Sequence, residues 1–164
     1  MATTKYVLWA CLGLLSVILL AQPAIGGAKT EFTASDQTTD LLALGTITYP
    51  DGNIHIRGAV VKTRVVSTLF NGNMIVTLNA NWDSTFSGPT WGTFVLTLDG
   101  GGVWEGTWTG KRTLGSGGWS DTLRGEAYGT GPGIDGLHMK VTETAASTTP
   151  IPFPYTGSIS GYVF

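Results

Sequence analysis

Apolar residues recur at every second position through most of this chain, in short runs separated by glycine, proline and asparagine. The run at 74–82 is the clearest: methionine, valine, leucine, alanine and tryptophan alternate with residues that include threonine and two asparagines. A period of two places each set on one face of an extended strand, whereas a helix needs a period of about 3.6. Because no helical period follows the first 28 residues, the pattern predicts an all-β protein.

Turn residues divide the pattern into eight predicted strands. The strands are expected at 44–49, 53–67, 74–82, 91–98, 103–113, 122–130, 134–144 and 158–164. The sequences at 50–52 (Pro-Asp-Gly) and 131–133 (Gly-Pro-Gly) are strong turn signals, because proline presets φ and glycine accepts a positive φ. Gly58 interrupts a long β-branched strand and indicates a bulge or a bend.

Short antiparallel strands at this spacing build either a barrel or a sandwich. An open meander would leave two sheet edges unpaired. The apolar strand at 158–164 is easier to explain if it pairs with an early strand and closes a barrel. We therefore expect an eight-stranded, mostly up-and-down antiparallel β-barrel of the calycin-like kind, with a sandwich as the alternative.

Residues 1–28 differ from the rest of the chain. Lys5 precedes an almost unbroken apolar run at 6–21, and small residues gather at 24–28. A positive charge, a short apolar core and a small-residue cleavage site predict a helical secretory signal segment. A retained membrane anchor is the alternative, although the run is shorter than the roughly 20 residues that a spanning helix needs. The expected organisation is a signal peptide at 1–28, a polar segment at 29–40 and one barrel domain at 41–164, in a secreted or periplasmic protein.

Charge and cysteine content narrow the expected partners. Charged residues are 12% of the chain, and no basic patch is present, so nucleic acid is not an expected partner. The only cysteine, Cys11, lies in the signal segment, so we expect neither a disulfide nor a thiolate metal site in the mature protein. His55 and His138 lack the spacing of metal ligands. We expect no metal and no cofactor.

The predicted strands at 103–113, 122–130 and 134–144 share one pattern. One face carries aromatic, apolar and glycine residues, and the other carries charged and polar residues. If the first face points inward, large and small side chains fill a narrow barrel, and the many small residues leave a partial cavity. The candidate lumen residues for a small, largely apolar ligand are then Trp104, Trp108, Ala127 and Met139.

The opposite orientation would gather charged and polar side chains in the lumen, as in an acid–base enzyme pocket. Its candidates are Glu105, Arg124, Glu126, Tyr128 and His138, with Lys140 beside them. The outer wall would then be apolar, which only oligomerisation or a membrane tolerates. Burial of so many charges also requires close pairing or shifted pKa values.

Three glycine- and aromatic-rich segments, at 104–110, 123–131 and 157–162, resemble strands of the allene oxide cyclase and dirigent group of barrels. The resemblance extends over the region from about residue 40 to residue 164. It implies a secreted eight-stranded barrel that holds an apolar substrate in its lumen and has cyclase- or isomerase-like activity. No catalytic residue of that group matches a position of this chain, so the resemblance bears on fold more than on activity.

Three functions from different classes follow from these patterns. The leading one is non-catalytic binding of a small, largely apolar molecule by an exported barrel. The second is cyclase- or dirigent-like control of a reactive apolar intermediate in a dry cavity. The third is carbohydrate binding or adhesion through exposed aromatic side chains. A membrane is expected to take part only through an uncleaved signal segment, and an oligomer is compatible with all three.

We predict that signal cleavage follows Gly26 or Ala28, because the small-residue sites end there. N-terminal sequencing of the exported protein should therefore begin at Gly27 or Lys29. Recovery of the chain from the membrane fraction with Met1 intact would show that the segment is an anchor.

Overall fold

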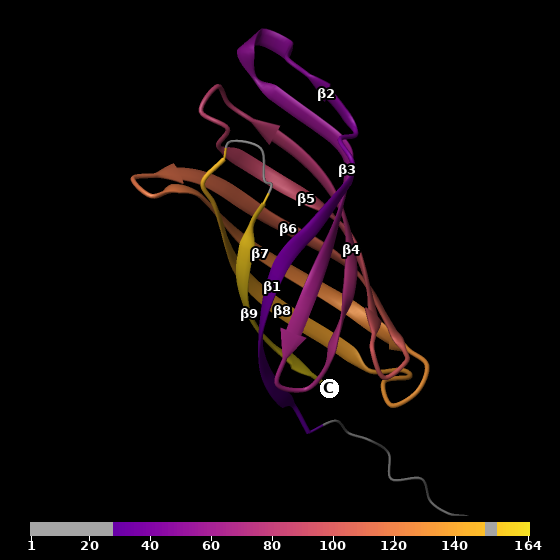
Figure 1. The fold of residues 1–164 in the computed structure, drawn as a ribbon. Helices are drawn as coiled ribbons and strands as arrows, with labels where there is room; N and C mark the ends of the chain where they lie inside the picture. Colours follow the sequence, from indigo (N-terminus) through magenta and orange to yellow (C-terminus); the bar gives the residue numbers. More distant parts are fainter. Residues whose placement is uncertain (1–27, 150–153) are drawn as a thin grey trace, which may run out of the picture.

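The structure, a computed structural model, describes residues 28–149 and 154–164, and its regular structure is almost entirely β-strand (Figure 1). The strands are β1 (Thr30–Ala43), β2 (Thr46–Thr48), β3 (Ile54–Ser67), β4 (Asn71–Trp82), β5 (Gly88–Leu98), β6 (Val103–Gly115), β7 (Gly118–Thr130), β8 (His138–Ser147) and β9 (Thr156–Val163). One turn of 3₁₀ helix, η1 (Pro50–Gly52), connects β2 to β3. The described ranges contain no helix that is long and apolar enough to cross a membrane. The expected signal helix lies, except for Ala28, outside the described residues.

Eight of these strands close into an antiparallel barrel. From β3 to β9 each strand pairs with the next one along the chain, and β1 pairs with both β3 and β9. In the closing ladder Thr30 lies opposite Val163, and Gln37 lies opposite Thr156. Figure 1 accordingly shows the C-terminal end beside the start of β1. The expected eight-stranded barrel and its closure by the final strand are confirmed, and a sandwich is excluded.

The first barrel strand is β1, which the sequence pattern did not predict. The polar segment at 29–40 was expected outside the barrel, yet it forms most of β1. Phe32 and Asp36 are buried, and Ala34 lies between them on the same face. The alternation is therefore present, but a small residue and an acid carry part of it, so a pattern based on apolar residues does not detect it. The strand expected at 44–49 is the short β2, which pairs only with β3 and projects beyond the barrel.

Two turn regions show how glycine shapes the strands. Gly58 has a φ of 70° and lies at the register shift between Ile56 and Ala59, which confirms the expected bulge. The strand expected at 134–144 begins only at His138. The preceding residues form a turn, in which Leu137 donates its amide hydrogen bond to the Ile134 carbonyl and Gly136 adopts a φ of 74°.

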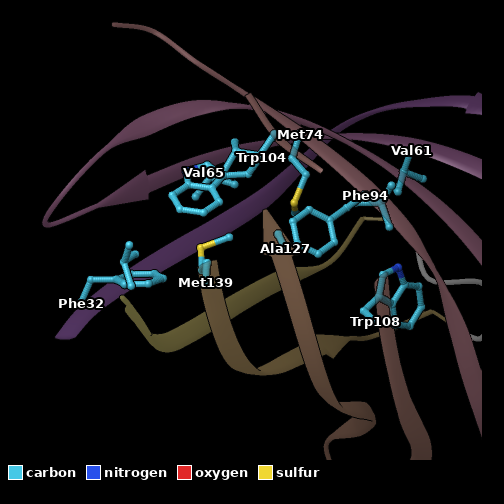
Figure 2. Close-up of a cluster of buried hydrophobic side chains, with 12 residues drawn as sticks. Phe32, Val61, Val65, Met74, Phe94, Trp104, Trp108, Ala127 and Met139 are labelled. Atoms are coloured by element: carbon cyan, nitrogen blue, oxygen red, sulfur yellow. The ribbon is translucent and has the colours of Figure 1, made fainter. Parts of the chain in front are cut away.

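The interior holds the apolar faces of the barrel strands. Trp104, Trp108, Ala127 and Met139 are all buried, and Figure 2 shows them among the inward-pointing side chains of a large apolar cluster. Glycine next to an aromatic side chain here means close packing. A Cβ added at Gly106 would lie 2.7 Å from both the Phe94 ring and the Ala127 Cβ. These two side chains therefore fill the space that a larger residue at position 106 would need.

We predict that two neighbouring residues of β6 differ sharply in their effect on stability. Trp104 is 0% exposed, so Trp104→Ala should lower the free energy of unfolding by about 3–5 kcal/mol, as large-to-small core substitutions do. Glu105 lies on the outer face, so Glu105→Ala should stay within about 0.5 kcal/mol of the parent. Urea unfolding measures both values, and a reversed ranking would contradict the inward face described here.

Candidate binding site in the barrel lumen

A cavity of about 90 Å³ lies inside the barrel, and its wall is mostly apolar. Trp108 and Met139 are part of this wall, whereas Trp104 and Ala127 are packed into the solid part of the core. Further apolar wall residues are Ala34, Val61, Phe94, Leu96, Val141 and Ile159. Two of the four lumen residues expected from the sequence therefore contact the cavity directly.

The wall of the hollow includes residues from all eight barrel strands, among them the strands that close the barrel. Ala34 of β1 is opposite Ile159 of β9, and Val141 lies on the adjacent β8. These three side chains point inward but are only partly buried, because they face the cavity. Small inward residues elsewhere leave no such space: a Cβ at Gly129 would lie 3.1 Å from the Ile134 side chain. The partial cavity expected from the glycine-rich face is present, but of the small residues in that face only Gly125 lines it.

Polar side chains gather at one end of this lumen. Arg112 and Asp121 are directly opposite each other in the β6–β7 ladder, and Arg112 Nη1 lies 3.3 Å from Asp121 Oδ2. Arg112 is 0% exposed, and its guanidinium lies 5.0 Å from the Trp82 ring and 5.7 Å from the Trp119 ring. Its Nη2 donates a hydrogen bond to the Thr149 carbonyl oxygen. This buried guanidinium is thus held by an acid, a carbonyl and two indoles.

Asp36 of β1 and Glu143 of β8 form a second acidic feature at the same end of the lumen. Both carboxyl groups approach Gly157 of β9, because a Cβ added there would lie within 2.7 Å of an oxygen of each. Neither Asp36 oxygen, nor Oε1 of Glu143, forms a hydrogen bond of normal geometry within the described residues. Glycine at position 157 is what allows the two carboxyl groups to occupy neighbouring positions.

Burial dominates the protonation of these groups. Burial raises the pKa of Asp36 to about 6, against weaker contacts with its own amide and the Tyr155 hydroxyl. Burial also raises the pKa of Asp121 to about 6, and the attraction of Arg112 opposes this rise only in part. The pKa of Glu143 is raised well above its ordinary value by burial and then by repulsion from Asp36 and Asp121. The lumen therefore contains carboxyl groups that can exchange protons near neutral pH.

Tyr155, which precedes β9, completes the polar end. Its hydroxyl lies 3.3 Å from Thr63 Oγ1, and burial raises its pKa, so it stays a neutral phenol. Two more polar atoms of the cavity wall, Thr90 Oγ1 and Trp108 Nε1, are buried without a hydrogen-bond partner among the described residues. A ligand in the cavity would meet an apolar wall and, at one end, donors and acceptors that lack partners.

The residues expected under the opposite orientation do not meet in the lumen. Glu105, Arg124, Glu126 and Tyr128 are exposed on the outer face, and Tyr128 is 62% exposed. His138 stacks on the Tyr128 ring with centroids 4.5 Å apart, and its Nε2 lies 3.5 Å from Glu126 Oε2. This outer group contains Glu126, Tyr128 and His138, and none of the three lines the cavity; of the five residues, Arg124 alone borders the cavity wall.

The acids and the arginine inside the barrel were missed by the sequence analysis. Their signal was present: Arg112 lies two residues beyond the inward row that ends at Gly110, and Asp121 lies two residues before Leu123. Glu143 follows Val141 in the same way. Continuing the period of two by one step would have placed all three inside, at the same end of neighbouring antiparallel strands.

No group of three or more histidine, cysteine, aspartate or glutamate side chains within residues 28–149 and 154–164 is arranged to hold a metal ion. Comparisons with protein-family models, with curated proteins and with solved structures found no match to this chain. The chemistry of the lumen is therefore inferred from its own residues.

We predict that the buried acids make stability depend on pH. The folded chain holds protons on Asp36 and Asp121 up to about pH 6, whereas their ordinary pKa is 3.8, so the free energy of unfolding falls as the pH rises through this interval. Asp36→Asn removes one such group, so the free energy of unfolding of this variant should fall less with pH than that of the parent. At the upper end of the interval the two falls should differ by about 2 kcal/mol or more. Asp40→Asn, at an exposed position of the same strand, should keep the slope of the parent. Urea unfolding at several pH values measures the slopes, and equal slopes for Asp36→Asn and the parent would contradict the prediction.

Proposed function

We propose that this protein binds a small, largely apolar molecule in the lumen of its barrel. The observation that carries the proposal is the apolar cavity inside the barrel, whose wall includes unpartnered polar atoms at one end. A cavity lined by apolar side chains gains free energy when hydrocarbon replaces solvent or empty space, by about 0.8 kcal/mol for each buried CH₂ group. The polar atoms add orientation, because they favour a ligand that has one polar end.

The size of the cavity limits the ligand. A single water molecule needs about 10–15 Å³ of such volume, so a cavity of about 90 Å³ accommodates roughly six to nine non-hydrogen atoms. Pockets for drug-sized ligands are larger, at about 300–1,000 Å³. The proposed ligand is therefore a short-chain or single-ring molecule.

A second candidate function is acid–base catalysis on an apolar substrate, of the cyclase or isomerase kind implied by the resemblance to the dirigent group. The adjacent carboxyl groups of Asp36 and Glu143 favour it, because they are buried and their pKa values are raised to different extents. Catalysis would require turnover, which binding alone does not. Carbohydrate adhesion has less support, since Trp82, Trp104 and Trp108 are buried.

The setting of the protein is also a proposal. A signal segment at 1–28 would deliver the barrel to the outside of the cytoplasm, where small apolar molecules are scarce in free solution and a carrier is useful. Binding of such molecules does not require a nucleic acid, a metal or a second protein.

We predict that two alanine-to-leucine substitutions separate binding from stability. Ala34 faces the cavity, so Ala34→Leu should fill it, keep stability within about 1 kcal/mol of the parent and abolish binding of 1-hexanol. Ala127 is 0% exposed and does not face the cavity, so Ala127→Leu should lose about 1–3 kcal/mol through overpacking. Titration calorimetry measures binding, and urea unfolding measures stability.

The parent and the Ala127→Leu variant, where folded, should both bind 1-hexanol. If the parent binds neither 1-hexanol nor shorter alcohols, and Ala34→Leu is as destabilised as Ala127→Leu, then the interior is solid and the proposed function is wrong.

A further inference from the structure

The charges at the polar end of the lumen do not balance. Three carboxyl groups, those of Asp36, Asp121 and Glu143, lie inside the barrel at this end, and Arg112 is the one cation that faces them in the part of the chain that the structure describes. Every other lysine, arginine or histidine on a described strand is at an outward-facing position, and of these Arg124 alone also borders the cavity wall. Since Arg112 is already paired with Asp121, two carboxyl groups have no cationic partner.

Two residues of the cavity wall at this end carry acceptor atoms without a hydrogen-bond partner. Glu143 and Thr90 both contribute to the cavity wall, and Glu143 Oε1 and Thr90 Oγ1 are inaccessible to solvent and form no hydrogen bond with the described residues. Thr90 itself is only 2% exposed. A buried polar atom without a partner is costly, and a ligand that donates hydrogen bonds would remove that cost.

Aromatic rings contribute to the same surroundings. Trp108 and Tyr155 are both part of the cavity wall, at or near the polar end. Aromatic rings attract cations as well as hydrocarbon, and this attraction is strongest where water is excluded. Acidic oxygens, an unpartnered hydroxyl and aromatic rings together are the groups that recognise an ammonium ion, which has three hydrogen-bond donors and no acceptor.

We propose that the lumen selects a small apolar amine, with its hydrocarbon part in the cavity and its protonated amino group beside Glu143, Asp36 and Thr90. This inference rests on the proposed function and specifies its ligand class. An alcohol of the same length would fill the cavity but leave the acids without a cation. A carboxylate would add a negative charge to a site that already holds three acids, which is unfavourable in a medium of low polarity.

Three ligands of matched length test the inference: n-hexylamine, 1-hexanol and hexanoate, each titrated calorimetrically into the protein near neutral pH. Hexylamine should bind at least about tenfold more tightly than hexanol, since a hydrogen-bonded contact between buried charges contributes about 1.5–3 kcal/mol. Hexanoate should not bind measurably.

Glu143→Gln identifies the residue responsible, because it keeps the shape of the side chain and replaces the ionisable carboxyl group with a neutral amide. Hexylamine affinity should fall roughly tenfold or more, while hexanol affinity should stay within about threefold of the parent. Glu105→Gln is the matched control: it removes a glutamate from the outer face and should change neither affinity.

The pH dependence of the parent gives a second test that needs no variant. Hexylamine remains a cation in acid, whereas Asp36 and Asp121 become neutral well below their pKa of about 6, so the preference for the amine should disappear there. This test decides the question if Glu143→Gln does not unfold cooperatively.

The outcomes separate the two proposals. If hexanol binds but hexylamine binds no more tightly, or loses no affinity in acid, the amine inference is wrong and the apolar binding site remains. If neither ligand binds, both the inference and the proposed function are wrong.

Discussion

The pairing of β1 with β9 is the interaction on which the rest of the structure depends. It joins the first and last described strands, so that no barrel strand is left with a free edge. The same ladder places Ala34 opposite Ile159, where the cavity lies, and Asp36 opposite Gly157, where the carboxyl groups meet. The single register of the β1–β9 ladder therefore closes the barrel and also positions the side chains of the cavity and of its polar end.

The polar end is difficult to explain as a contribution to stability. Burial of an ion pair such as Arg112–Asp121 often costs more than it returns, and the two further acids near Gly157 have no cation at all. Such an arrangement in a cavity wall is typical of a site that recognises a polar group of a ligand.

Much of the fold follows from the period of two. It predicted a closed antiparallel barrel and seven of its eight strands, the bulge at Gly58 and the inward position of Trp104, Trp108 and Met139. It did not predict β1, because Asp36 occupies an inward position that the pattern assigns to an apolar residue. An acid is acceptable there only because a glycine lies opposite it on a strand more than a hundred residues away along the chain.

The candidate site was predictable only in part for the same reason. Trp108 and Met139 could be assigned to the lumen from their own strands. The proximity of Asp36 to Glu143, and of Arg112 to Trp119, arises from the register between strands, which a single sequence does not reveal. Alternation along a strand predicts which way a side chain points, and the closed barrel decides which side chains it meets.

A crystal structure of the protein under xenon pressure tests the central claim most directly, because xenon enters apolar cavities without needing a polar contact. The account predicts a xenon atom inside the barrel between Ala34, Val141 and Trp108, with the acids at one end of the same hollow. An interior in which side chains fill that space, with no xenon bound there, would contradict it.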